Sequence, residues 1–345
     1  MSNPTIFILG AYGFVGSHLT RILGEKHPDY RLLCLMRNPT PERLDPLKGL
    51  HPNIEIIEGA LEDTELISKT SEDVDVVLNT ASSDHWPSVE ATLDGLTKNS
   101  AKHPGKPPLY IHVSGCGIIS DNVRGEKVDN VKEWTDVGLD LKDCPPTNTH
   151  LESDTKIVEA GTRSENPIRT IILFPGQIYG IGEVQKTTMW LRIFSQMAKN
   201  VGYSGTWGPG EISQGNIHVK DCASALVLLL ESALEGKAGE GKDGLYFGVA
   251  PVPLITYKQW TEIMGDILHN KGLLKEPGSH PFPPEITDAW GHYGWSLLGS
   301  NQHAKADRLL QLGWEPEWSK KESILDVLPA MIEVAAQDLI AAEKK

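Results

Sequence analysis

The chain has 345 residues, 39% of them hydrophobic and 23% charged, which is too much apolar material for a disordered protein and enough for a large core. Its 32 basic and 46 acidic residues give a formal net charge of −14, which argues against a nucleic-acid partner and against docking on an anionic membrane. The cysteines are scattered and no cluster of residues has metal-ligand spacing, so we expect no metal site. No segment approaches the roughly 18–20 apolar residues of a membrane span, so we expect a soluble cytoplasmic protein.

Short β-rich runs alternate with helical patterns through the first half of the chain, which is typical of βαβ units around a parallel sheet. Several runs are almost continuously apolar, as expected for strands covered on both faces. The expected strands are Thr5–Leu9, Arg31–Met36, Ile54–Glu58, Val74–Thr80, Leu109–Ser114, Arg169–Phe174 and, later, Leu245–Val249.

The pattern changes after residue 175, where helices dominate. Trp190–Lys199 and Ala223–Leu234 look amphipathic, and Thr256 with Gln259 three positions later forms a capping box at the start of another helix. Lys275–Pro284 is rich in Pro and Gly and predicts an exposed loop.

These elements predict an α/β fold, a Rossmann-type doubly wound parallel sheet with a smaller C-terminal substrate-binding lobe. We expect residues 1–180 to form the nucleotide-binding domain, whose sheet also receives segments near 216–250. Residues 181–345 would form most of the substrate-binding lobe.

Three glycines follow the first predicted strand in the spacing G-x-x-G-x-x-G. Gly10 permits a tight turn, Gly13 lets the backbone approach a diphosphate, and Gly16 lets the helix pack closely on the strand. Amide groups at the start of the helix would then bind the diphosphate, helped by the helix dipole. The cofactor-binding residues expected here are Gly10, Tyr12, Gly13, Phe14, Val15 and Gly16.

The end of the second predicted strand bears on which dinucleotide binds. NAD sites commonly carry an acidic residue here for the ribose 2′-hydroxyl, whereas this chain has Met36 followed by Arg37. A guanidinium group suits a 2′-phosphate, because it forms charge-assisted and often bidentate hydrogen bonds. We therefore expect NADP(H) in preference to NAD(H).

Six further motifs, in chain order, make the sequence resemble the extended short-chain dehydrogenase/reductases, also called NAD-dependent epimerase/dehydratases. They are E-G-A-L-E-D (Glu58–Asp63), L-N-T-A (Leu78–Ala81), V-S-G-C-G (Val113–Gly117), F-P-G-Q-I-Y-G (Phe174–Gly180), N-I-H-V-K-D (Asn216–Asp221) and L-G-W-E-P (Leu312–Pro316). The resemblance covers nearly the whole chain. It implies further cofactor contacts at Leu61, Thr80, Ala81, Pro175 and Ile178.

The chain departs from this family at the residues that carry its chemistry, because the family's catalytic Y-x-x-x-K is absent. Two registers of the predicted helix Thr149–Gly161 could replace it. One puts Glu152 and Lys156 at the Tyr and Lys positions, on a charged stripe typical of an exposed face. The other uses His150 and Asp154, which share a face with apolar residues able to pack on the sheet, and we favour this second register.

In that register His150 would be the general acid, since an imidazole can deliver a proton at neutral pH. Asp154, one turn on, could hold the ring in one tautomer, as a carboxylate does in a triad. Cys116 takes the position of the family's catalytic Ser or Thr, with Ser114 as a nearby substitute. The structural alternatives are a packed small residue for Cys116 and a helix N-terminal residue for His150.

Nine tryptophans favour an apolar or aromatic small molecule as the substrate over a nucleotide sugar, although core packing is the alternative for each ring. The residues expected at the substrate are Trp86, Tyr179, Trp190 and Trp207. His292 and Tyr293 lie on a segment that could also reach it.

Three functions stay open. We favour an NADP(H)-dependent reductase of a carbonyl group. A non-redox epimerase, dehydratase or cyclase would use the same fold, and a non-catalytic NADP-binding regulator would resemble the NmrA-like relatives that also lack the Tyr. Relatives often form homodimers through two helices, so a homodimer is a further possibility.

Overall fold

The computed structural model describes residues 3–342 and contains a seven-stranded sheet in which every neighbouring pair of strands is parallel. The strands are β1 (Thr5–Leu9), β2 (Arg31–Met36), β3 (Ile54–Glu58), β4 (Val76–Asn79), β5 (Leu109–Val113), β7 (Arg169–Pro175) and β11 (Leu245–Gly248). Their order across the sheet is β11-β7-β5-β4-β1-β2-β3. The predicted α/β fold and all seven predicted strands are confirmed, with small differences at the strand ends.

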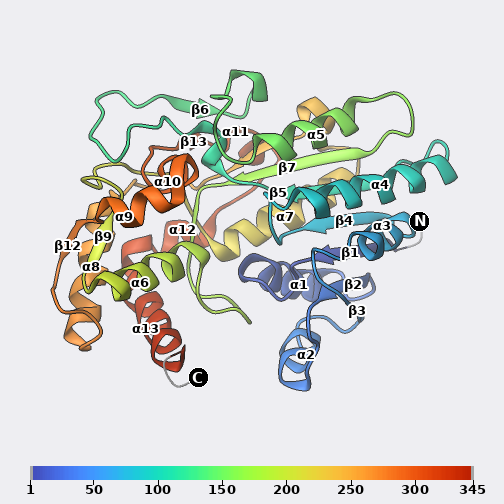
Figure 1. Cartoon of the computed structure of the whole chain (residues 1–345). Helices are drawn as coiled ribbons and strands as arrows, with labels where there is room; N and C mark the ends of the chain where they lie inside the picture. Colours follow the sequence, from blue (N-terminus) through green and yellow to red (C-terminus); the bar gives the residue numbers. More distant parts are fainter. Residues whose placement is uncertain (1–2, 343–345) are drawn as a thin grey trace.

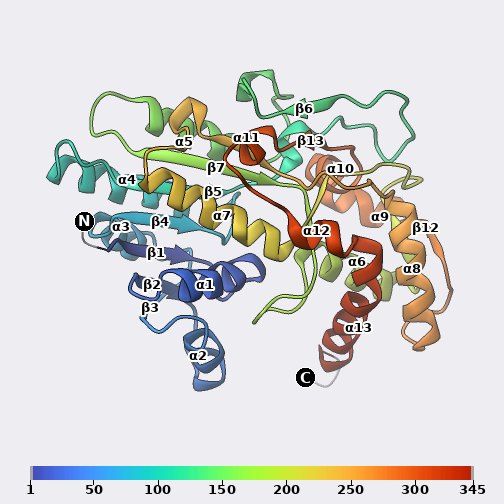
Figure 2. The same ribbon diagram turned by 180° about the vertical axis from the view of Figure 1, so that it is seen from behind.

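Helices cover both faces of this sheet, which explains why its central strands read as continuous apolar runs. Figure 1 shows α3 (Thr64–Glu72), α4 (Trp86–Lys102) and α5 (Leu151–Thr162) across one face. Figure 2 shows α1 (Phe14–Lys26) and α7 (Val219–Leu234) packed together across the other. The short α2 (Pro41–Lys48) lies between β2 and β3 in the chain.

The second half of the chain adds helices and short strand pairs beside the sheet (Figure 1). The helices are α6 (Met189–Val201), α8 (Tyr257–Asn270), α9 (Pro284–Thr287), α10 (Gly291–Leu298), α11 (Asp307–Gln311), α12 (Glu317–Lys321) and α13 (Ile324–Ala342). The paired strands are β6 (Glu133–Thr135) with β13 (His303–Lys305), β8 (Gln177–Tyr179) with β10 (Asn216–His218), and β9 (Ser204–Thr206) with β12 (Ser279–Pro281).

Two clusters of buried hydrophobic residues correspond to this layout. The first surrounds the sheet, and the second lies among α6, α8, α10 and α13. The predicted capping box of Thr256 and Gln259 is confirmed at the start of α8. Part of Lys275–Pro284 is not a loop, because β12 pairs there with β9.

No helix within residues 3–342 is long and apolar enough to cross a bilayer. Over the same residues, no group of three His, Cys, Asp or Glu side chains is placed to hold a metal ion. All four cysteines are buried and free of disulfide bonds.

Candidate active site

A cleft with a volume of about 610 Å³ opens at the carboxyl ends of the central strands. It lies where β1 has β2 on one side and β4 on the other, the point at which the strand order reverses and where open α/β sheets bind ligands. The sequence-predicted residues that line it are Gly10, Tyr12, Gly13, Phe14, Val15, Arg37, Leu61, Thr80, Ala81, Ser114, Cys116, His150, Pro175, Ile178 and Trp190. Those that do not line it are Gly16, Trp86, Asp154, Tyr179 and Trp207.

The glycine turn between β1 and α1 has no room for side chains. Gly10 has φ +89°, and a Cβ there would lie 2.8 Å from the backbone nitrogen of Ala81. A Cβ on Gly16 would come within 2.1 Å of the carbonyl oxygen of Gly10, so Gly16 serves close packing and not the ligand. Gly13 is the N-cap of α1, which leaves the first amide groups of the helix facing the cleft for an anion.

Two arginines flank the cleft beyond this turn. Arg37 follows β2 and is exposed. Arg43, which the sequence reading missed, donates hydrogen bonds to the carbonyl oxygens of Arg37 and Asn38. Its guanidinium carbon lies 4.8 Å from the centre of the Tyr12 ring. Two cationic groups and an aromatic ring therefore surround one end of the cleft.

His150 projects into the cleft from the start of α5. Its Nδ1 lies 2.6 Å from Oδ1 of Asp84 and 3.1 Å from Oγ of Ser83. Its Nε2 makes no hydrogen bond with any residue from 3 to 342, and it rests against Gly115 and Gly117, where an added Cβ would approach it to 3.0 Å. The unpaired nitrogen is therefore available to a ligand.

The backbone of His150 has φ +74°, a left-handed conformation that costs a non-glycine residue on the order of 1–3 kcal/mol. Asp84 compensates by fixing the ring, and its Oδ2 accepts a hydrogen bond of 3.2 Å from the Tyr293 hydroxyl. Burial opposes ionisation of Asp84, but its hydrogen bonds with His150 and Tyr293 outweigh burial, so its pKa lies below the ordinary value. Asp84 is thus a carboxylate that can hold a protonated imidazole.

Asp154 does not hold His150, which corrects the sequence-based expectation. Its side chain is fully buried, and Oδ2 accepts a 2.7 Å hydrogen bond from the Ser114 hydroxyl. One turn of helix aligns the two Cα positions, but the Asp154 side chain extends beneath the cleft while His150 lies on its wall. Asp84, from the end of β4, was missed because its place next to His150 depends on the sheet.

Cys116 also differs from the expected catalytic role. It borders the cleft, but only 1% of it is exposed and its thiol donates to the carbonyl oxygen of Phe174. Burial raises the pKa of this thiol, so it stays neutral. The packed small residue, the alternative weighed for Cys116, describes it better.

The aromatic residues expected at the substrate separate into two groups. Trp190 lines the cleft, and its indole donates a 2.7 Å hydrogen bond to the carbonyl oxygen of Ile178. Trp207 is fully buried, edge-on to Phe194, in the second cluster. The Tyr179 hydroxyl donates to the backbone of residue 322, away from the cleft, and Trp86 begins α4 outside it.

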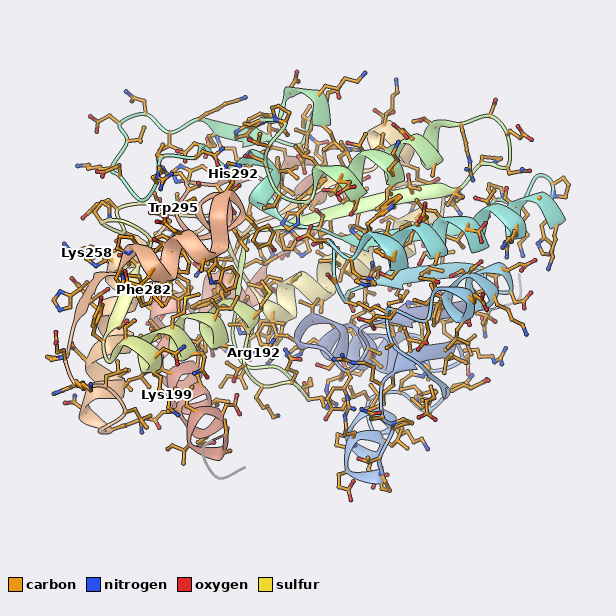
Figure 3. The ribbon with its side chains drawn as sticks, viewed as in Figure 1. Arg192, Lys199, Lys258, Phe282, His292 and Trp295 are labelled. Atoms are coloured by element: carbon orange, nitrogen blue, oxygen red, sulfur yellow. The ribbon has the colours of Figure 1, made fainter. Side chains whose placement is uncertain are left out.

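Other cleft residues had no clear sequence signal, because they come from separate segments of the second half of the chain. They include Gln177, Gln185, Met189, Arg192, Gln214, Tyr257, Leu297, Leu298 and Gln302. Tyr293, which the sequence analysis did name, also lines the cleft. In Figure 3, Arg192 lies on α6 on the side facing the N-terminal half, and His292 lies on α10. Nε2 of His292 is 2.9 Å from the carbonyl oxygen of Thr147, which ties α10 to the segment before α5.

Comparisons with known proteins found a family model and relatives that match part of the sequence. Residues 6–102 match the model of the NAD dependent epimerase/dehydratase family. The chain is 27% identical to oxidase ucsJ of an Acremonium species over 235 residues, a region that covers 66% of each protein.

Solved structures of extended short-chain dehydrogenase/reductase type share the fold. A dTDP-glucose 4,6-dehydratase from Bacillus anthracis, in complex with NAD, has a TM-score of 0.63 and 15% identity, with 94% of this chain and 95% of that chain covered. A UDP-glucuronic acid 4-epimerase from Bacillus cereus, also in complex with NAD, has a TM-score of 0.61 and 18% identity, with 96% of both chains covered.

Proposed function

We propose that the chain is an NADP(H)-dependent oxidoreductase that reduces a carbonyl group of an apolar or aromatic small molecule. The match of residues 6–102 to the NAD dependent epimerase/dehydratase family and the fold shared with the solved structures above support this proposal. One observation carries this proposal: the unpaired Nε2 of His150 lies in the same cleft as the glycine turn. An acid/base group and a dinucleotide cradle therefore share one cavity.

The cleft supplies the groups that this reaction needs. Bound NADPH would provide the hydride that adds to the carbonyl carbon. As the carbonyl oxygen gains the electron pair of its broken π bond, His150 gives it a proton from Nε2. Asp84 accepts the hydrogen bond from Nδ1, which orients the ring and stabilises its charged form before the transfer. Solvent returns the proton afterwards.

Arg37 and Arg43 support NADP(H) over NAD(H). A 2′-phosphate is a dianion near neutral pH, and the cleft offers it charge-assisted hydrogen bonds from Arg37 and from Arg43, whose guanidinium group lies over Tyr12. The solved neighbours reported above hold NAD, so this preference is a property proposed for this chain alone.

The far end of the cleft supports an apolar substrate. Met189, Trp190, Leu297 and Leu298 give it an apolar wall. Gln214 is already engaged, because its amide nitrogen donates to the backbone and its oxygen accepts from the Tyr257 hydroxyl at 2.8 Å. A sugar would need more polar partners than such a wall offers.

The test is turnover. The purified full-length chain, mixed with NADPH and a panel of aromatic and aliphatic ketones and aldehydes, is expected to consume NADPH. The variant His150→Ala should lower kcat by about tenfold or more while leaving the dissociation constant of NADPH, measured by calorimetry, nearly unchanged. Loss of the proton donor slows chemistry without touching the glycine turn.

Lys156→Ala is the matched control, because Lys156 lies on the same helix but is exposed and paired with Glu159. It should behave as the wild type, whereas an effect limited to Lys156→Ala would favour the other register of the helix. Tight NADPH binding without turnover would indicate a regulatory protein. Product formed without net NADPH consumption would indicate an epimerase, dehydratase or cyclase.

A further inference from the structure

Beneath the cleft lies a buried polar network that the proposed reaction has not yet used. It joins the end of β4 to the end of β5. Its members are all at least 90% buried: Asn79, Tyr110, His112, Ser114 and Asp154. Of these, only Ser114 lines the cleft. Two atoms in the network, Nε2 of His112 and Oδ1 of Asp154, have no hydrogen-bond partner within residues 3–342 and lie 3.9 Å apart.

The tautomer of His112 follows from its neighbours. The Asn79 side-chain oxygen accepts from the backbone nitrogen of Ala81 at 3.0 Å, which places the Asn79 amide nitrogen 3.2 Å from Nδ1 of His112. The Tyr110 hydroxyl also lies 2.9 Å from Nδ1. With donors facing it, Nδ1 is the acceptor, so the proton of the neutral ring is on Nε2. That N–H therefore lies beside Oδ1 of Asp154, at a nitrogen–oxygen distance of 3.9 Å that is too long for a hydrogen bond.

This arrangement leaves one place for a proton on Asp154. Oδ1 has no hydrogen-bond acceptor within residues 3–342, whereas Oδ2 lies 2.7 Å from Ser114 Oγ, so the hydrogen of a neutral carboxyl group belongs on Oδ2. The carboxyl group then donates to Ser114 Oγ, and the Ser114 hydrogen is free to turn into the cleft. When Asp154 is ionised, Ser114 donates to Oδ2 across the observed 2.7 Å and shows the cleft only lone pairs.

We propose that the protonation state of Asp154 selects the role of Ser114 in the cleft: a neutral Asp154 makes Ser114 a hydrogen-bond donor to the carbonyl oxygen being reduced, and an ionised Asp154 leaves Ser114 an acceptor for a substrate hydroxyl. Asp154 is thus a positioning residue, and Ser114 is the group that touches the substrate. The inference rests on the proposed function for the identity of that oxygen.

The surroundings of Asp154 make both states accessible. Burial raises its pKa to about 7, against the lowering effects of the His150 charge and the Ser114 hydrogen bond. Burial lowers the pKa of His112 to about 3, so this ring stays neutral and does not bind Asp154 as a cation. The titratable groups that interact with Asp154 are His112 and Tyr110 on β5, His150 on α5, Asp84 after β4 and Cys144 before α5.

The decisive variant is Asp154→Asn. An asparagine places its oxygen towards the His112 N–H and its amide group towards Ser114, which reproduces the neutral state at every pH. We expect kcat/KM for carbonyl reduction by the wild type to fall as the pH rises through about 7, because Asp154 ionises there. The Asp154→Asn variant lacks this loss, so its kcat/KM divided by that of the wild type should rise by about tenfold or more between about pH 6 and pH 9.

Ser114→Ala should lower kcat/KM by about tenfold or more, and adding Asp154→Asn to it should have no further effect on the pH profile. Infrared spectroscopy gives a readout that needs no turnover: the part of the carboxylic-acid carbonyl band that the wild type loses near pH 7 should be missing from Asp154→Asn, whereas the part that Asp136 loses near pH 6 should remain. Asp136→Asn is the control, because Asp136 is another buried acid whose pKa is raised, to about 6, and it does not line the cleft.

A flat ratio of variant to wild type, or an infrared band that does not titrate, overturns the inference. So does a pH profile that Asp136→Asn alters as strongly as Asp154→Asn. Failure of the proposed function looks different: no carbonyl compound supports NADPH consumption, whatever the infrared band does.

Discussion

Arg37 and Arg43 differ in how firmly they are held. Arg43 donates to two backbone carbonyl oxygens, those of Arg37 and Asn38, and lies over the Tyr12 ring, so its guanidinium group is preorganised. Arg37 is exposed and free to adjust to a ligand. Because Arg43 is already ordered, it loses little side-chain entropy when a phosphate group binds, while Arg37 can adjust its position to the same phosphate.

Removing either guanidinium group should weaken NADPH specifically. We expect Arg37→Ala and Arg43→Ala each to raise the dissociation constant of NADPH by about tenfold or more, since a hydrogen bond to a charged group contributes about 1.5–3 kcal/mol. The dissociation constant of NADH, measured by the same calorimetry, should change little. Arg31→Ala, at the opposite end of β2 and paired with Glu55, is the control. Equal losses for both coenzymes would contradict the phosphate contact.

The loop after β5 and the start of α5 depend on each other. Gly115 and Gly117 leave space into which the His150 ring packs, and a Cβ on either would lie 3.0 Å from Nε2 of that ring. A Cβ on Gly117 would also come within 2.1 Å of the Thr149 hydroxyl oxygen. The glycines therefore set how closely α5 can bring its imidazole to the carboxyl end of β5.

Gly115→Ala should displace chiefly the imidazole, because the three atoms nearest the added Cβ, apart from those of its chain neighbours, all belong to the His150 ring. We expect kcat to fall by about tenfold, with the melting temperature and the NADPH dissociation constant close to those of the wild type. In a His150→Ala background the same change should have almost no effect. Gly49→Ala, whose nearest neighbours would lie at 3.5 Å or more, serves as the control. Additive effects of the two changes would show that Gly115 acts elsewhere.

Over the whole molecule, buried acids and buried imidazoles make opposite contributions to the pH dependence of stability. Burial raises the pKa of Asp154 to about 7, so its contribution is complete below about pH 4 and is lost as the pH rises to about 7. Burial lowers the pKa of His112 to about 3 and that of His218 to about 4. Below about pH 6.5 the unfolded chain therefore takes up protons on these rings that the folded chain does not, so the free energy of unfolding decreases as the pH falls. The two trends oppose each other between about pH 4 and pH 6.5.

Asp154→Asn removes one side of this balance. The amide cannot ionise, so the melting temperature of the variant relative to the wild type should increase as the pH rises from about 4 to about 8. Thermal unfolding followed by circular dichroism across that range measures the difference. A difference that stays constant or decreases with pH would mean that Asp154 is ionised in the folded protein throughout.

The sequence by itself determined the features that depend on neighbours along the chain. Apolar runs identified most of the seven parallel strands, because strands covered on both faces have no polar side, and the alternation with helical patterns identified the rest. The glycine spacing located the turn between β1 and α1, since a tight turn and a close helix need residues without a Cβ at fixed offsets. Helix periodicity singled out His150 as a candidate, but His150 precedes α5 with a left-handed backbone and does not share a face with Asp154.

Only the tertiary structure decided which groups surround that imidazole. Asp84 is 66 residues away in the chain and reaches His150 because α4, which Asp84 precedes, packs beside α5, which His150 precedes. Asp154 is four residues away, yet its side chain lies beneath the cleft with Ser114. Likewise, Trp207 belongs to the second core cluster and not to the substrate wall. Helical spacing fixes which side chains share a face, but the depth of each and its partner on another strand depend on how separate elements pack.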